Sequence, residues 1–203
     1  MTSKTRRTAI GSAAALGAVS LLTAAFAIAA PPINGTDGPD TLTGTDGPDR
    51  IFARAGEDTI DAQAGRDRIR AGKGNDTVEA GFGRDRVRGG DGDDTLNGGP
   101  GRDLIFAQRG VDTVNGGEGS DNLWALARAD VTRAAGEPSD TVNGGPGHDR
   151  IHVRDGEADT VTCGPGFDIV KADRKDKVSP DCERLNRRSV RAKDDDDEND
   201  DAS

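Results

Sequence analysis

Aliphatic residues recur every nine positions along the middle of the chain, and each follows an aspartate by two positions. Ten aspartates keep this spacing without a slip: Asp40, Asp49, Asp58, Asp67, Asp76, Asp85, Asp94, Asp103, Asp112 and Asp121. A glycine precedes each aspartate by two positions, so every repeat joins a turn to a short run in which polar residues flank one aliphatic residue. Such alternation is typical of a strand with one buried face. The fixed short period predicts stacked turns, that is, an all-β parallel solenoid.

Two nonapeptides form one coil of 18 residues, because the chemistry alternates between odd and even repeats. The residue after the aspartate is Thr in every odd repeat, whereas the even repeats begin with Arg and end with Leu104 and Asn122. We therefore expect about seven coils with a threonine face and an arginine-rich face that becomes aromatic toward Phe106 and Trp124. The aliphatic residues expected to point inward are Leu42, Ile51, Ile60, Ile69, Val78, Val87, Leu96, Ile105, Val114 and Leu123.

The start of the chain is a separate segment. Residues 1–29 have a basic start and then a small, apolar run, which predicts a signal peptide cleaved after Ala29. An uncleaved membrane anchor is the alternative, and the pair Arg6-Arg7 leaves Sec and twin-arginine export both open.

The nine-residue period divides the rest of the chain into segments. Repeats resume after an interruption, which we interpret as an inserted loop; a degenerate repeat centred on Asp130 is the alternative. The acidic end predicts a disordered tail. The expected segments are a linker (30–34), regular β-roll (35–124), insertion (125–134), continued β-roll (135–178), cap (179–186) and tail (187–203).

Composition is compatible with a thin solenoid and not with a thick globular core. Only 32% of the residues are hydrophobic and 3% aromatic, and the formal net charge is −10. The two cysteines, Cys163 and Cys182, lie at the end of the repeats, where an even count in an exported chain predicts a disulfide. Two free thiols are the alternative, and no zinc pattern is present.

The best copies of the repeat read GGDGDDTLN, GGPGRDLIF and GGEGSDNLW, over Gly89–Asn97, Gly98–Phe106 and Gly116–Trp124. They resemble the nonapeptide GGxGxDxUx of haemolysin-type RTX calcium-binding proteins, and the resemblance covers about Gly35 to Val178. It implies a β-roll in which calcium lies between turns on one edge, held by loop carbonyls and by aspartates from repeats two apart.

Charge repulsion also points to a cation. Aspartates of successive coils would stack about 5 Å apart and repel each other. Calcium takes about six to eight oxygen ligands, including carboxylates and carbonyls. We expect the Gly89–Asp94 turn to be the best site, because Asp93 and Asn75 add oxygens. The candidate calcium ligands are Asp40, Asp49, Asp58, Asp67, Asp76, Asp85, Gly89, Asp91, Asp93, Asp94, Asp103, Asp121 and Asp149.

Arginine at the fifth position of some turns departs from the RTX pattern. Arg66, Arg84 and Arg102 could neutralise the neighbouring aspartates in place of calcium. The alternative to a calcium-bound roll is therefore a solenoid held by salt bridges.

No catalytic motif is present: the chain has no GxSxG, HExxH or P-loop, and we interpret His148 and His152 as surface residues. The sequence predicts a secreted, monomeric, non-enzymatic protein that folds on calcium, with no nucleic-acid partner and no membrane contact after signal cleavage.

Two other functions are compatible with the faces of the solenoid. A threonine ladder could bind ice, through Thr41, Thr59, Thr77, Thr95 and Thr113. An adhesin could bind anionic polysaccharide or a cell surface through an outward strip of basic and aromatic residues. The strip comprises Arg50, Arg68, Arg70, Arg86, Arg88, Phe52, Phe106 and Trp124.

Overall fold

The computed structural model describes residues 31–125 and 139–187. The expected signal peptide, the degenerate repeat around Asp130, nearly all of the expected insertion and nearly all of the acidic tail lie outside these ranges. In the parts of the chain that the structure describes, no helix has the length and apolarity that a bilayer span needs.

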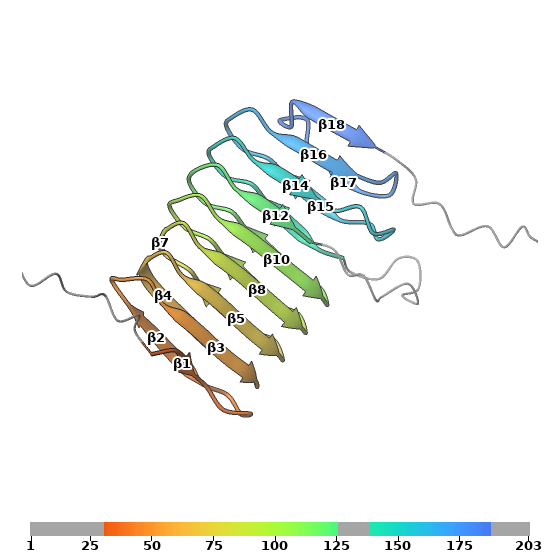
Figure 1. Cartoon of the computed structure of the whole chain (residues 1–203). Coiled ribbons are helices and arrows are strands. Elements are labelled where there is room, and N and C mark those ends of the chain that lie inside the picture. The colour runs from red at the N-terminus through yellow and green to blue at the C-terminus, as the bar shows by residue number, and fades with distance from the viewer. Residues whose placement is uncertain (1–30, 126–138, 188–203) are drawn as a thin grey trace, which may run out of the picture.

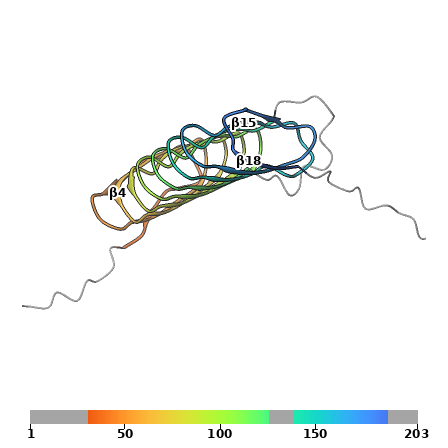
Figure 2. The same ribbon diagram turned by 90° about the horizontal axis from the view of Figure 1, so that it is seen from above.

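The described chain winds into a flattened parallel solenoid, as the period predicts, with about eight turns where about seven coils were expected (Figures 1 and 2). Even repeats form one sheet, here the arginine sheet. Its strands, in order, are β1 (Ile33–Asn34), β3 (Arg50–Ala55), β5 (Arg68–Lys73), β8 (Arg86–Asp91), β10 (Leu104–Arg109), β12 (Asn122–Trp124), β14 (Arg150–His152), β16 (Ile169–Ala172) and β18 (Arg184–Arg187).

Odd repeats form the opposite sheet, here the threonine sheet. Its strands are β2 (Thr41–Thr45), β4 (Thr59–Gly65), β6 (Thr77–Glu79), β9 (Thr95–Asn97), β11 (Thr113–Asn115), β13 (Thr141–Asn143), β15 (Thr160–Thr162) and β17 (Lys177–Val178), with β7 (Phe82–Gly83) beside β4. Because each coil returns to the same sheet, equivalent residues stack in register, as Thr59 does on Thr77.

The strand pairing continues across the interruption. Thr113 of β11 pairs with Thr141 of β13, and Asn122 of β12 pairs with Arg150 of β14. The odd and even repeats therefore keep their own sheets although 28 residues separate the paired aspartates Asp112 and Asp140. The chain therefore accommodates ten residues beyond one coil here, as expected for an inserted loop after which the repeats resume.

The core is a double column of aliphatic side chains between the two sheets. All but one of the inward residues predicted from the repeat are buried, and half-buried Leu42 packs against the same core at its first coil. Small residues at the first position of a turn, such as Ala53 and Ala62, are also fully buried. The thickness of one side chain from each sheet explains why so few aromatic residues suffice.

Both ends of the solenoid differ from the expected boundaries. Ile33–Asn34, expected as linker, pairs with β3 and starts the arginine sheet. Val178 was expected to end the strands, but Arg184–Arg187 pairs with β16 as one more strand. These strands have no repeat motif; their pairing covers backbone groups that an open sheet edge would leave unpaired.

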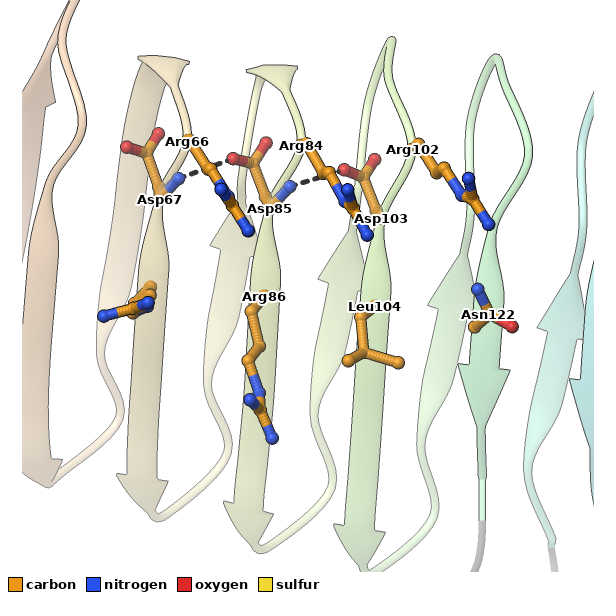
Figure 3. Close-up of a pocket in the computed structure, with 10 residues that line it drawn as sticks. Arg66, Asp67, Arg84, Asp85, Arg86, Arg102, Asp103, Leu104 and Asn122 are labelled. Carbon is orange, nitrogen blue, oxygen red and sulfur yellow. Dashed lines mark hydrogen bonds between the residues drawn. The ribbon is translucent and has the colours of Figure 1, made fainter.

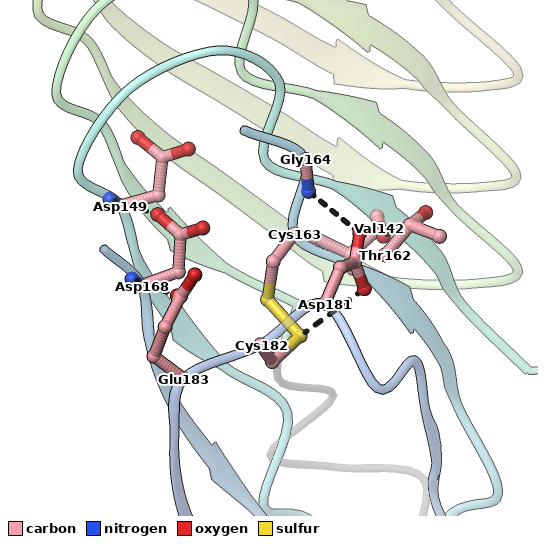
Figure 4. Close-up of a disulfide and its surroundings, with 9 residues drawn as sticks. All are labelled: Val142, Asp149, Thr162, Cys163, Gly164, Asp168, Asp181, Cys182 and Glu183. Atoms are coloured by element: carbon pink, nitrogen blue, oxygen red, sulfur yellow. Dashed lines mark hydrogen bonds between the residues drawn. A yellow bond between two sulfur atoms is a disulfide. The ribbon is translucent and has the colours of Figure 1, made fainter. Parts of the chain in front are cut away.

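The predicted disulfide between Cys163 and Cys182 is confirmed, with a Cα–Cα distance of 5.3 Å (Figure 4). The residues beside Cys182 also bond to the last coils. Asp181 Oδ2 accepts the N–H of Gly164 at 2.9 Å, and Glu183 Oε2 accepts the N–H of Asp168 at 2.7 Å. This segment therefore pins β18 against the end of the solenoid.

We expect Cys163→Ser/Cys182→Ser to destabilise the C-terminal coils by about 3 kcal/mol, the chain-entropy value for a loop of this size. Hydrogen exchange should show faster amide exchange in β15, β16 and β18. Strands β3 to β8 serve as the internal control. Uniformly faster exchange along the whole solenoid would show that the disulfide does not act locally.

Candidate functional site

The aspartates form two ladders, one along each turn edge of the solenoid. In both, Oδ1 of an aspartate accepts the N–H of the aspartate one coil earlier; Asp103 Oδ1, for example, accepts from Asp85 at 2.8 Å. The odd ladder contains Asp40, Asp58, Asp76, Asp94, Asp112, Asp140 and Asp159. The even ladder contains Asp49, Asp67, Asp85, Asp103, Asp121, Asp149 and Asp168.

The second oxygen, Oδ2, is the functional feature of these ladders. It is buried and has no hydrogen-bond partner in Asp58, Asp67, Asp76, Asp85, Asp94, Asp103, Asp121, Asp140, Asp149, Asp159 and Asp168. The first coil differs: Oδ2 of Asp40 accepts the N–H of Thr36 at 2.6 Å, and Oδ2 of Asp49 accepts that of Thr45 at 2.6 Å. Threonine therefore satisfies the candidate ligands Asp40 and Asp49 within their own turns.

Burial raises the pKa of the ladder carboxyl groups whose Oδ2 is unpaired. Loss of hydration is the largest cause, and the N–H bond from the coil before opposes it; the pKa of Asp94 and of Asp103 rises to about 7. The pKa of Asp140 rises to about 8 and that of Asp159 to about 9. A buried carboxylate with an unpaired oxygen is stabilised by a proton or by a cation.

Glycine at the first turn position leaves a cradle beside this oxygen. A Cβ added at Gly98 would lie 2.7 Å from Asp103 Oδ2 and 2.5 Å from the carbonyl oxygen of Gly116, one coil later. At Gly144 the corresponding distances are 2.7 Å to Asp149 Oδ2 and 2.6 Å to the carbonyl oxygen of Cys163. Gly89 and Gly116 have the same arrangement, toward Asp94 and Asp121. Each cradle thus combines hard oxygens from adjacent coils.

Alanine occupies this first position in other turns. Ala80 stands one coil before Gly98 and carries a buried methyl group there. The same substitution precedes Asp58, Asp67, Asp76, Asp85 and Asp112, at Ala53, Ala62, Ala71, Ala80 and Ala107. The backbone is unchanged, since Arg54, Gln63 and Gln108 at the second position adopt the left-handed φ of the glycines they replace. Among the turns whose first residue lies in 31–125 or 139–187, only those that begin Gly-Gly therefore keep both an open cradle and an unpaired oxygen.

The extra oxygens of the Gly89–Asp94 turn already have partners. Asn75 Oδ1 accepts the N–H of Asp93 at 2.9 Å, and Asp93 Oδ1 accepts that of Val111 at 2.7 Å. Asp91 forms an ion pair with Arg109 at 3.4 Å. These side chains connect neighbouring turns and are not available to a cation. If this turn binds calcium best, Gly89 and Asp94 are the residues responsible.

The arginines of the turns do not neutralise the ladders. Within residues 31–125 and 139–187 the ion pair between Arg109 and Asp91 is the only one. Arg66, Arg84 and Arg102 extend toward the arginine sheet, clear of the carboxylates (Figure 3). The salt-bridge alternative is therefore wrong for the described coils, although the charge of Arg102 opposes the rise in the pKa of Asp121.

The histidines play different structural roles. His148 is exposed and its Nδ1 accepts the N–H of Phe167 at 2.8 Å. His152 is half-buried and stacks on Trp124 with ring centroids 3.8 Å apart, so it is more than a surface residue. Across the residues described, no three His, Cys, Asp or Glu side chains gather into a metal-binding group. Any metal held here would depend on single carboxylates and main-chain oxygens.

A comparison with protein families agrees with this geometry. The family model of the RTX calcium-binding nonapeptide repeat, which spans four copies, matches the chain over 34–69, 55–87, 63–96, 88–123 and 135–170. RTX nonapeptide repeats bind Ca²⁺. No curated protein and no solved structure matches the chain. Because the matched segments cover more than half of the sequence, the chain belongs to the RTX calcium-binding nonapeptide repeat family.

Proposed function

We propose that this is a secreted calcium-binding β-roll protein in which calcium binds between stacked glycine turns and drives folding. The observation that carries the proposal is the buried, unpaired Oδ2 beside an open glycine cradle. Carboxylate and carbonyl oxygens are the ligands that calcium prefers. When bound, the ion supplies the positive charge that the buried carboxylates lack.

Four turns fit calcium best. They end in Asp94, Asp103, Asp121 and Asp149, and each begins with a glycine whose cradle faces a carbonyl of the following coil. Asp58, Asp67, Asp76 and Asp85 are weaker candidates, because an alanine methyl occupies the equivalent position. Asp40 and Asp49 are the weakest, because threonine already satisfies their oxygens. We also expect the turn of Asp94 to bind calcium more tightly than that of Asp112, because Gly89 stands where the other turn has Ala107.

Asp103→Asn tests the assignment. We expect isothermal titration calorimetry to show about one calcium ion fewer or a large loss of affinity at one site, since a ligand charge is removed. Asn can still accept the Asp85 N–H through its amide oxygen. Gly98→Ala should give the same loss without removing a carboxylate, because it introduces the methyl group that Ala80 already carries.

Asp85→Asn is the matched control, one coil earlier on the same ladder and also next to an arginine. It should change calcium binding much less than Asp103→Asn. Equal losses in the two variants would show that the glycine cradle does not select the sites.

A non-enzymatic role is part of this proposal and is supported by the family, because the RTX repeat β-roll is a calcium-binding structural domain and not a catalytic fold. A second candidate function, a surface-interaction module, is favoured by one observation: apart from Arg109, which pairs with Asp91, the arginines of the arginine sheet form no ion pair with an acidic residue among the described residues.

A further inference from the structure

Eight arginines line two adjoining hollows on the arginine sheet. The first, here the arginine groove, has a volume of about 260 Å³. Five arginines line it, together with the ladder residues Asp67, Asp85 and Asp103 at its turn edge (Figure 3): Arg66, Arg68, Arg84, Arg86 and Arg102. The second, of about 230 Å³, shares Arg68 and Arg86 and adds Arg50, Arg70 and Arg88. The turn arginines, which the sequence suggested would pair with aspartates, thus belong to the basic face.

This face is electrostatically unfavourable by itself. Arg50, Arg68 and Arg86 are direct neighbours on adjacent strands, and like charges so placed destabilise a sheet. The chain has 37 acidic residues against 27 Lys and Arg. Nevertheless, no acidic residue in the described part of the chain forms an ion pair with these eight arginines. A polyanion would relieve the repulsion.

The aromatic rings beside the groove hold guanidinium groups. Arg50 and Arg70 lie over Phe52 at 5.8 and 5.5 Å from the ring centroid. Arg86 and Arg88 lie over Phe106 at 5.7 and 5.9 Å. Such stacking orients the planar groups and limits the freedom lost when a ligand binds.

The same rings argue against nucleic-acid recognition by stacking. Phe52 and Phe106 are covered by arginines, and Trp124 stacks between Phe106, at 6.0 Å, and His152. Single-stranded nucleic acids are usually bound on open aromatic faces. A ligand recognised through its anionic groups alone fits this surface better.

We propose that the arginine groove binds a linear anionic polysaccharide through its sulfate or carboxylate groups. Arg66, Arg84 and Arg102 repeat at the strand spacing of about 4.8 Å. Their guanidinium groups are therefore evenly spaced and can each donate two hydrogen bonds to an anionic group of a polymer whose charges are also regularly spaced. Because the protein as a whole is acidic, it is repelled by a broad anionic membrane. This repulsion is smaller for a single polysaccharide strand that lies in a narrow basic groove. This inference gives the second candidate function a ligand class and a site.

In the test, a heparin-derived hexasaccharide is titrated into calcium-saturated full-length protein, and its affinity is measured by isothermal titration calorimetry. Arg66→Gln/Arg84→Gln/Arg102→Gln should bind roughly tenfold more weakly or worse, since exposed charge pairs contribute up to a few-fold each. The control Arg174→Gln/Lys177→Gln/Arg184→Gln removes the same charge from exposed positions at the far end and should bind as the parent does. Neutral maltohexaose should not bind.

Circular dichroism of each variant shows whether it still folds with calcium. Weaker binding by a folded variant can then be attributed to the missing groove arginines. A footprint on the unmodified protein needs no variant: the hexasaccharide should protect the groove arginines from a dicarbonyl reagent, and leave Arg174 and Arg184 reactive. Equal affinity of the two triple variants, or no protection, would overturn the proposal. Tighter groove-dependent binding of single-stranded DNA or of phosphatidylglycerol vesicles would also overturn it.

Discussion

Millimolar calcium is expected to convert the chelated chain cooperatively into the β-roll and to raise its melting temperature by tens of degrees. Four sites, each at calcium concentrations near 100 times its dissociation constant, would add about 2.7 kcal/mol apiece, or on the order of 10 kcal/mol. This equals the entire stability of a typical domain. Circular dichroism in EDTA and then in calcium measures the change.

The physical reason is the combination of a thin core and buried charge. The apolar interior is only one side chain deep from each sheet. The unpaired Oδ2 atoms lie along both edges of that interior, where ionised carboxylates lose hydration. Calcium binds only the folded arrangement of these oxygens, so its binding energy becomes folding energy.

Magnesium is the control, because it requires a tighter octahedral set of ligands and gives up its water reluctantly. It should restore little structure at the same concentration. Identical spectra and melting temperatures in EDTA and in calcium would refute calcium-driven folding.

The calcium-free protein is expected to be most stable in acid and to lose stability as the pH rises from about 4 to 9. The ladder aspartates with an unpaired Oδ2 have folded pKa values raised above the ordinary 3.8, to about 6 for Asp76, about 7 for Asp94 and about 9 for Asp159. Groups with raised folded pKa values bind more protons in the folded than in the unfolded chain. Their contribution to the stability of the folded chain is therefore fully present below pH 3.8. It is lost as the pH rises through their pKa values in the folded state.

Thermal melts in EDTA between pH 4 and 9 measure this effect, and a fall of more than about 10 °C is expected, at about 2–4 °C per kcal/mol. Calcium should abolish or reverse the trend, because it replaces the protons and binds more tightly as they leave. The variant Asp103→Asn should be more stable than the parent in EDTA at pH 8 and less stable in calcium. Calcium-free stability that rises with pH would show that the ladder carboxylates are not buried as described.

The repeat allowed much of this architecture to be predicted. The 18-residue coil, its two chemically different faces and the resumption of the repeats after the interruption follow from side-chain spacing. The Cys163–Cys182 bridge follows from the even number of cysteines and their place at the end of the repeats. The strand Arg184–Arg187 could not be predicted, since it carries no repeat and is stabilised by pairing with β16.

The candidate site was only partly predictable, because spacing does not reveal what each oxygen contacts. Stacked carboxylates were expected to face each other, but one oxygen of each ladder aspartate accepts a main-chain N–H instead. The difference between Gly98 and Ala80 was visible in the sequence, yet its meaning depends on the carbonyl of Gly116 that lies beside the glycine. The direction of Arg66, Arg84 and Arg102 likewise depended on the folded turn.

The assignment of alternate repeats to opposite sheets limits how such a chain can change length. Removing 18 residues, such as Asp76 to Asp93, would delete one rung and leave each later side chain on its own sheet. Removing nine would exchange the sheets for all later repeats, placing Thr113 in the arginine column and Arg150 in the threonine column. Duplication and loss during evolution should therefore proceed by whole coils, and artificial rolls of chosen length can be assembled from the same 18-residue unit.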